Sequence, residues 1–276
     1  MLIIDIPHTV YRIFIKCEDP NLESIVAVQY YPYIYYKPLS QSKDSIYIEQ
    51  KGNSIVTKTK EDIKQIFPKN NIIALRKIIN SCITGDNNYV VLHGSCITYK
   101  DQAIIILGNS CSGKSTLTAY LMANGYHYLT DDCVLLDAKS GKVFPYKRLL
   151  HLREGGYKLL QKERVFYPAC HLTIDNFDRW TVFPSENLNL VEYKVSYLLK
   201  LARSSHSSDF SFSGIQNYKE KIGFISQNIY SPSDLVRSVK YVSVIAQTTP
   251  LYFVKDAALS QAKYCIEQIL KSKEEF

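Results

Sequence analysis

Hydrophobic and polar residues alternate along much of the first 88 residues, and such alternation is typical of half-buried strands. The alternating runs are 11–16, the tyrosine-rich stretch 24–36, and 45–50 with 54–58 on either side of a hairpin signal at Gly52. We therefore predict a small β-rich module over residues 1–88. Its tyrosine stripe is either half-buried sheet surface, which is the commoner case, or a face that recognises a peptide.

Two helices are expected to close this module. Thr59 is a candidate N-cap for a short helix that ends near Pro68, and the pattern over residues 72–83 predicts a second helix. The turn-rich segment 84–88 then marks a boundary, so residues 89–276 are expected to form a second domain.

From Tyr89 onwards short strands alternate with helices, which predicts an α/β domain. Strands are expected at 89–92, 96–99, 103–107, 126–129, 133–137, 143–144, 193–201 and 251–254, and helices at 114–124, 233–247 and 257–273. Gly125 closes the first helix, and Ser233 is a candidate N-cap for the second. Residues 145–184 show no pattern that predicts an element.

Composition narrows the class of protein. Hydrophobic residues make up 46% of the chain and charged residues 21%, as in ordinary globular proteins. No apolar run approaches the ~18 residues that a membrane helix needs, and the start Met1-Leu2-Ile3-Ile4-Asp5 lacks the features of a signal peptide. We therefore expect a cytoplasmic protein with no membrane partner. The seven scattered cysteines include no Cys-x-x-Cys pair and predict neither a disulfide framework nor a zinc site.

The net charge of +7 is spread along the chain without a basic run. No nucleic-acid partner is therefore expected. A mild basic excess suits a phosphate-rich ligand or an acidic partner, although a solvated surface is the commoner reason for it.

The strongest chemical signal is Gly108-Asn109-Ser110-Cys111-Ser112-Gly113-Lys114-Ser115, which fits the phosphate-loop pattern Gly-x-x-x-x-Gly-Lys-[Ser/Thr]. An apolar strand precedes it and a helix follows it, as the pattern requires. We expect this loop, together with Thr116, to bind ATP. Its backbone N–H groups would surround the phosphates, Lys114 would reach the outer ones, and the Ser115 hydroxyl would bind Mg²⁺.

Two further signals flank the loop. Asp131 and Asp132 follow the next predicted strand, where a metal ligand and a general base would be placed beside Mg-ATP. His93 ends the strand at 89–92, and a single histidine is more often structural than catalytic.

Together these three signals resemble the catalytic core of the HPr kinase/phosphorylase family of bacterial serine kinases. The shared order is His93-Gly94, a strand, the phosphate loop, a helix that ends in Gly125, and then Asp131-Asp132. The resemblance implies a phosphate-loop kinase core with a mixed sheet, similar to that of phosphoenolpyruvate carboxykinase. It also implies that His93, Lys114, Asp131 and Asp132 are catalytic. Ser115 and Asp132 are the expected Mg²⁺ ligands, while the choice of the base between the two aspartates stays open.

The resemblance is clear over residues 89–136. The family segment Glu-[Ile/Val]-Arg-Gly-x-Gly has its nearest counterpart in 151–156, where the order of residues differs. Arg148, Arg153 and Glu154 are therefore candidates for phosphate or metal contacts, with a solvated loop as the alternative. The region before His93 is shorter than the N-terminal domain of full-length members. In this the chain resembles stand-alone relatives such as the kinases of lasso-peptide precursors.

The function expected from the sequence is Mg-ATP-dependent transfer of phosphate to a Ser or Thr hydroxyl of a peptide or small protein, which could be a ribosomal precursor peptide or an HPr-like protein. The alternatives are a kinase for a small metabolite and a nucleotide-sensing module without turnover. The first module is expected to recognise the acceptor. The family resemblance also implies a homo-oligomer.

Overall fold

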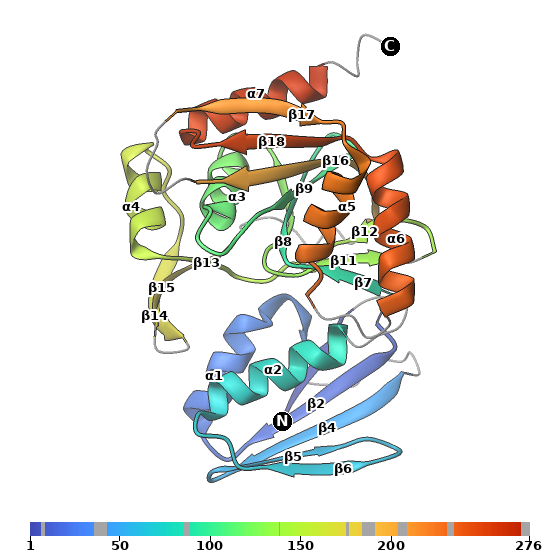
Figure 1. Ribbon diagram of the computed structural model, residues 1–276. Helices are drawn as coiled ribbons and strands as arrows, with labels where there is room; N and C mark the ends of the chain where they lie inside the picture. Colours follow the sequence, from blue (N-terminus) through green and yellow to red (C-terminus); the bar gives the residue numbers. More distant parts are fainter. Residues whose placement is uncertain are drawn as a thin grey trace. The chain divides into compact units, whose positions relative to one another are not determined.

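The computed structural model describes residues 1–6, 9–35, 43–84, 89–137, 139–174, 177–183, 191–203, 209–230 and 235–271. The chain is a mixed α/β protein with several sheets. It divides into two compact units, one made of Met1–Asn87 with His171–Arg179 and the other of Asn88–Cys170 with Trp180–Phe276. Each unit has its own sheet and helices (Figure 1).

The first unit contains a six-stranded sheet of order β3-β1-β2-β4-β5-β6, in which β2 and β4 are parallel and the other pairs antiparallel. Its elements are β1 (Leu2–Asp5), β2 (Tyr11–Cys17), α1 (Pro20–Gln29), the 3₁₀ turn η1 (Tyr31–Tyr33), β3 (Ile34–Tyr35), β4 (Asp44–Lys51), β5 (Ser54–Lys58), β6 (Ile63–Ile66) and α2 (Asn71–Thr84). The predicted strand at 11–16, the hairpin around Gly52 and the helix at 72–83 are confirmed.

Residues 24–36 do not form the predicted strand. Helix α1 starts at Pro20, where Asp19 accepts a hydrogen bond from the Asn21 amide and caps the first turn. Leu22, Val26 and Gln29 then share one buried face at helical spacing. Burial of that face overrides the alternation read from the sequence, and of the tyrosine stripe only β3 joins the sheet. Tyr36 lies outside the described residues.

The short helix predicted after Thr59 is also wrong, because residues 63–66 form the edge strand β6. The Thr59 hydroxyl accepts hydrogen bonds from the amides of Glu61 and Asp62, as an N-cap would. Its own amide, however, donates to the Asp62 carbonyl and closes a turn between β5 and β6. Thr59, which the sequence predicts as a helix cap, therefore stabilises the turn of a β-hairpin.

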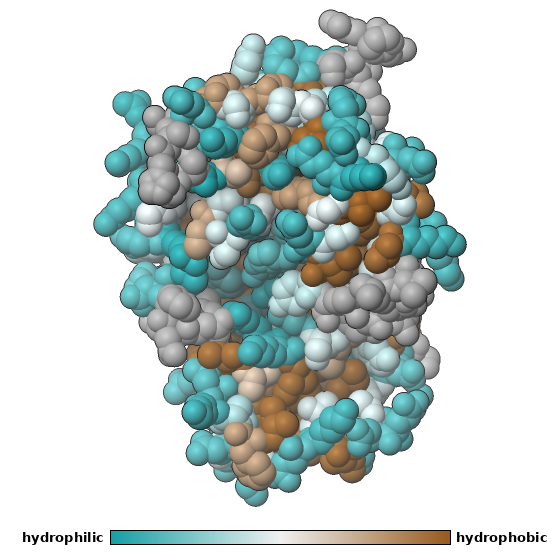
Figure 2. Space-filling view, viewed as in Figure 1, coloured by the Kyte–Doolittle hydropathy of each residue, from teal (hydrophilic) through white to brown (hydrophobic). Residues whose placement is uncertain are grey.

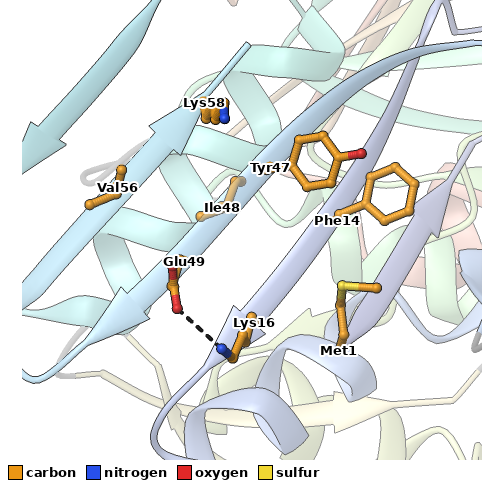
Figure 3. Close-up of a pocket in the computed structure, with 8 residues that line it drawn as sticks. All are labelled: Met1, Phe14, Lys16, Tyr47, Ile48, Glu49, Val56 and Lys58. Carbon is orange, nitrogen blue, oxygen red and sulfur yellow. Dashed lines mark hydrogen bonds and ion pairs between the residues drawn. The ribbon is translucent and has the colours of Figure 1, made fainter.

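Alternate residues of β2, β4 and β5 lie on the open face of this sheet. They line a shallow depression of about 210 Å³, shown in Figure 3, with Met1, Phe14, Lys16, Tyr47, Ile48, Glu49, Val56 and Lys58 around it. The rings of Phe14 and Tyr47 stack at 4.8 Å, and Lys16 pairs with Glu49 at 3.3 Å. The depression contains none of the residues that the sequence singles out for chemistry.

The second unit is built on a nine-stranded sheet of order β10-β8-β9-β16-β12-β11-β7, with β18 beside β16 and β17 beside β18. The strands are β7 (Tyr89–Leu92), β8 (Gly94–Tyr99), β9 (Gln102–Leu107), β10 (His127–Thr130), β11 (Val134–Asp137), β12 (Lys142–Phe144), β16 (Tyr193–Ala202), β17 (Ser211–Ile215) and β18 (Leu251–Lys255). β16 runs parallel to both β9 and β18. The described strand predictions of this unit are confirmed.

Helices cover both faces of the sheet (Figure 1). The helices are α3 (Lys114–Met122), α4 (Glu154–Lys162), α5 (Tyr218–Gln227), α6 (Leu235–Thr248) and α7 (Leu259–Lys271). Ile104 and Ile106 of β9 pack in the core with α3 and α7, whereas Ile105 and Leu107 pack in the core with α5 and α6. Because β9 is buried on both faces, it reads as a continuous apolar run in the sequence.

Residues 145–183 contain elements that the sequence pattern does not predict. They are β13 (Leu150–Leu152), α4, β14 (Ala169–Ile174) and β15 (Phe177–Val182), and the three strands form a sheet of order β13-β15-β14. Strand β17 and helix α5 also have no counterpart in the sequence predictions. The expected turn at 85–88 and the expected cap at Ser233 lie outside the described residues.

The outer face of α6 carries exposed apolar side chains, which Figure 2 shows as brown atoms over that helix. Val239 and Val244 are 47% and 49% exposed. Among the described residues, no helix combines the length and the apolar character needed to cross a bilayer.

Candidate active site

The segment 108–113 connects the end of β9 to the start of α3, as the sequence predicts. Glycine is required at both ends of this loop. A Cβ on Gly108 would lie 2.3 Å from the backbone oxygen of Leu201 in β16, so a larger residue would push the two parallel strands apart. Gly113 has φ +97° and is the N-cap of α3, a conformation that side chains rarely adopt.

The loop presents unpaired donors. Gly113 has no side chain with which to cap α3, so the first N–H groups of the helix lack a side-chain acceptor. The Ser112 hydroxyl is buried and has no hydrogen-bond partner within the described part of the chain. Asn109, Ser110 and Cys111 are exposed at the loop tip. A buried hydroxyl and a helix N-terminus that face the same loop form a site that an anion would complete.

Lys114 folds back over this loop. Its Nζ donates to the carbonyl oxygens of Gly108 at 2.8 Å and Asn109 at 3.0 Å. Burial lowers the pKa of its ammonium group, and the nearby charges of Asp131 and Asp132 oppose that shift. The lysine is thus a desolvated cation at the loop, available to an anion that displaces the two carbonyls.

Asp131 links three elements at the start of α3. Its Oδ1 accepts a hydrogen bond from the Ser95 hydroxyl of β8 at 2.5 Å, and its Oδ2 accepts one from the Ser115 hydroxyl of α3 at 2.8 Å. Burial raises the pKa of this carboxyl group and the charge of Asp132 adds to the shift, while the two serine hydrogen bonds and Lys114 oppose it. Burial makes the charged form of this carboxylate costly. A hard cation such as Mg²⁺, which prefers oxygen ligands, would stabilise the carboxylate and the Ser115 hydroxyl beside it.

The side chain of the adjacent Asp132 is exposed, in contrast to that of Asp131. Asp132 has φ +70° and its side chain is 54% exposed. The Thr130 hydroxyl donates to the Cys133 carbonyl at 2.6 Å, which holds the turn between β10 and β11. Two neighbouring aspartates therefore have different surroundings, one buried against α3 and one open to solvent.

His93 lies beside Asp132 in the link between β7 and β8. Its amide donates to the Asn228 carbonyl at 2.6 Å, and its Nδ1 is 3.3 Å from the backbone oxygen of Asp132 and 3.8 Å from Oδ1. The next residue, Gly94, has no room for a side chain, since a Cβ would be 2.7 Å from the Ile106 oxygen of β9. The His-Gly pair thus lets β8 lie against β9 and brings the imidazole to the aspartate turn.

The three candidates for further phosphate or metal contacts, Arg148, Arg153 and Glu154, have distinct positions. Arg148 is buried and its Nη1 lies 3.8 Å from the Cys133 sulfur, next to the aspartate turn. Arg153 is the exposed N-cap of α4. The Glu154 carboxylate accepts a hydrogen bond from the Trp180 indole at 2.5 Å and pairs with Lys158 at 3.1 Å, so its contacts here are with side chains of its own neighbourhood.

The sequence assigns Mg²⁺ to Ser115 and Asp132, but the structure pairs Ser115 with Asp131. This pairing bears on which of the two aspartates is the general base, a choice that the sequence left open. The buried carboxylate is the one beside the candidate metal ligand, and the exposed one is beside His93. In the described part of the chain, no cluster of three or more His, Cys, Asp or Glu side chains could hold a metal alone. Mg²⁺ usually takes one or two carboxylates plus phosphate and water, so these residues fit it only together with a nucleotide.

Two residues beside the loop escaped the sequence analysis. Arg203 directly follows β16, and its guanidinium atoms lie 3.5–4.0 Å from the position of a Cβ on Gly113. Ser95 holds Asp131. Both positions depend on which strands are neighbours, β16 beside β9 and β8 beside β10. A strand prediction for 193–201 contains no information about its partner, so no signal in the sequence pointed to Arg203.

The chain was also compared with known proteins. No family model matches it, and no curated protein matches its sequence. Among solved structures, the Hpr(Ser) kinase/phosphatase from Coxiella burnetii matches with a TM-score of 0.33 and 9% sequence identity, over 67% of this chain and 95% of that chain.

Proposed function

We propose that this protein transfers the terminal phosphate of Mg-ATP to a Ser or Thr hydroxyl of a peptide or small protein. The proposal rests on one observation. Two carboxylates, one buried and one exposed, lie beside the loop whose sequence fits the phosphate-loop pattern. Asp131 is bonded to Ser115 at the start of α3, and Asp132 lies beside His93. A loop that only bound nucleotide would have no need for the second carboxylate and the imidazole.

In this proposal the loop holds the phosphates. The N–H groups at the start of α3 and the Ser112 hydroxyl donate to phosphate oxygens, and Lys114 exchanges its contacts with Gly108 and Asn109 for the outer phosphates. Arg203, next to Gly113, adds positive charge where the transferred group becomes more negative. The helix N-terminus and the Ser112 hydroxyl are already positioned, so among these three donors only Lys114 has to exchange its contacts when the nucleotide binds.

Ser115 and Asp131 are the proposed Mg²⁺ ligands. The bound ion would neutralise phosphate charge and relieve the cost of the buried Asp131 carboxylate. Asp132 is the proposed general base, because an exposed carboxylate can reach the acceptor hydroxyl and take its proton. His93, which lies against Asp132, orients that carboxylate and the transferring group.

The acceptor class rests on the resemblance between the motif order and the HPr kinase-like serine kinases. The same resemblance makes a stand-alone, peptide-modifying kinase the preferred form of the proposal. A homo-oligomer also stays a prediction, and size-exclusion chromatography with light scattering would measure it.

The test compares Lys114→Ala and Asp132→Asn with wild type in Mg-ATP, using a pool of Ser- and Thr-containing synthetic peptides and mass spectrometry of the products. Lys114→Ala should abolish measurable ATP binding. Asp132→Asn should bind ATP normally and lose about 10²–10⁴-fold in phosphotransfer, the usual contribution of a general base. Asp101→Asn, an exposed aspartate in the turn between β8 and β9, is the matched control and should behave as wild type.

Three outcomes would change the conclusion. Phosphotransfer at the wild-type rate in Asp132→Asn would remove the proposed base. Phosphorylated metabolites in a cell extract, without any phosphopeptide, would make the protein a small-metabolite kinase. ATP binding that depends on Lys114 but yields no phosphorylated product would identify a nucleotide sensor.

A further inference from the structure

A stacked aromatic pair lies beside α3, outside the residues used so far. The rings of Tyr157 in α4 and Trp180 in β15 are 4.1 Å apart and only 8° from parallel. Both side chains pack at the edge of the core that contains α3 and remain partly exposed. They therefore form a flat, partly exposed aromatic surface on the second unit.

Polar contacts fix the orientation of this pair. The Trp180 Nε1 donates to Glu154 Oε2 at 2.5 Å, and the other carboxylate oxygen of Glu154 pairs with Lys158 one turn along α4. On the strand side, Trp180 is opposite Leu152 of β13, the strand that leads into α4. The Trp180 backbone is thus paired within a sheet and its indole is hydrogen-bonded to α4, so the surface is already ordered without a ligand.

Helix α4, which carries Tyr157, lies against the start of α3. Gly156, which precedes Tyr157, approaches the phosphate-loop helix so closely that a Cβ would lie 2.4 Å from Thr116 Oγ1. Thr116 is the residue directly after Ser115. Helix α4 therefore begins against the first turn of α3, and Figure 1 shows the two helices as neighbours.

We propose that the exposed face of Tyr157 and Trp180 is the stacking platform for the base of the bound nucleotide. This inference rests on the proposed function, because it places the base at the side of a loop that holds the phosphates. The occupant is a purine base, since it is the flat, apolar part of the ATP that the loop is proposed to bind. Stacking of a base on an aromatic side chain strengthens binding by about 5- to 150-fold.

The single tryptophan of the chain makes the platform directly measurable. In the wild-type protein, ATP should quench the fluorescence of Trp180, whereas inorganic triphosphate should bind, as seen by calorimetry, without quenching. In Tyr157→Leu and Trp180→Leu the Kd for ATP should rise about 5- to 150-fold while that for triphosphate stays within about twofold. Trp180→Phe, which keeps an aromatic ring, should restore most of the ATP affinity.

The controls separate this inference from the proposed function. Phe166→Leu removes an aromatic ring that is 71% exposed, and both affinities should remain at wild-type values. Lys114→Ala should abolish the measurable binding of ATP and of triphosphate alike. Two results would contradict the platform: ATP binding without quenching, or leucine variants that change the Kd for ATP and the Kd for triphosphate equally or change neither. Either result would leave the proposed phosphate-binding loop unaffected. If the wild-type protein binds neither ligand, both proposals fail.

Discussion

Asp131 is the residue whose position demands most explanation. A carboxylate buried to 6% exposure is costly, and here burial and the neighbouring Asp132 both raise its pKa. Its hydrogen bonds from Ser95 and Ser115 reduce that cost and aim both oxygens. In the proposed function this cost in stability is offset when Mg²⁺ binds.

We predict that Asp131→Asn makes the metal-free protein more stable. Asparagine keeps hydrogen-bonding contacts with both serines and removes the buried charge. At pH 7.5 in a chelating buffer, the Tm of the variant should exceed that of wild type, by about 2–4 °C for each ~1 kcal/mol gained. Thermal unfolding followed by circular dichroism measures it.

The pH dependence gives the control. Because the pKa of Asp131 is raised in the folded state, the folded protein keeps this proton to higher pH than the unfolded chain does. The wild type therefore loses stability as pH rises from the unfolded pKa, about 3.9, through the folded pKa. The Tm difference should be small in acid and grow towards neutral pH. A variant that is less stable than wild type at pH 7.5 would contradict the argument.

At the scale of elements, the site is assembled by close contacts between secondary structures. Gly108 lets β9 run against β16, Gly94 lets β8 run against β9, and Gly156 lets α4 start against α3. None of these three positions has room for a Cβ. Each glycine is therefore explained by a tertiary approach, and of the three only Gly108 also has a positive φ.

Adjacent glycines in α4 provide a matched pair of substitutions. Gly156→Ala should destabilise the protein by about 1–3 kcal/mol, because its Cβ would be 2.4 Å from Thr116 Oγ1 and would force the two helices apart. Gly155 has no atom within 4 Å of its Cβ position, so Gly155→Ala should be neutral or stabilise the helix by up to about 1 kcal/mol. Urea denaturation of both variants measures the difference.

A second substitution tests the cause. Thr116→Ala removes the atom that the new Cβ meets, so the double variant Gly156→Ala with Thr116→Ala should be more stable than the sum of the single effects predicts. Strict additivity would show that the glycine matters for another reason.

At the scale of the whole molecule, the proposed active site and the open face of the six-stranded sheet belong to different units. Every proposed site residue from His93 to Arg203 lies in the second unit, and the depression lined by Phe14 and Tyr47 lies in the first. We therefore keep the hypothesis that the first unit recognises the acceptor. The two roles can be separated experimentally because the six-stranded and the nine-stranded sheets belong to different units.

Removal of the residues before Tyr89 should lower peptide phosphorylation at least about tenfold, equivalent to ~1.4 kcal/mol, while the Kd for ATP changes by less than about threefold. The expected reason is loss of the acceptor contacts proposed for residues 1–87 of the first unit, whose segment His171–Arg179 stays in the shortened chain. Phosphopeptide yield and ATP calorimetry on the same preparation measure the two effects. Parallel loss of both would count against a recognition role.

The sequence by itself determined much of the second unit. The apolar run of β9, the loop after it, the glycine stop of α3 and the hairpin of β11 with β12 all follow from patterns within a few residues. It also singled out His93, Lys114 and the two aspartates. In the first unit its local signals were weaker. The run at 24–36 led to the wrong element because its buried face has helical spacing, and the cap at Thr59 did so because residues 63–66 pair with β5 across a turn.

Only the tertiary structure decided which of these residues meet. Ser115 pairs with Asp131 and not with Asp132, Arg203 reaches Gly113, and Trp180 stacks on Tyr157, all through contacts between residues distant in sequence. The physical reason is that periodicity and capping act over one or two turns of chain, whereas strand neighbours and helix contacts are selected by burial across the whole unit.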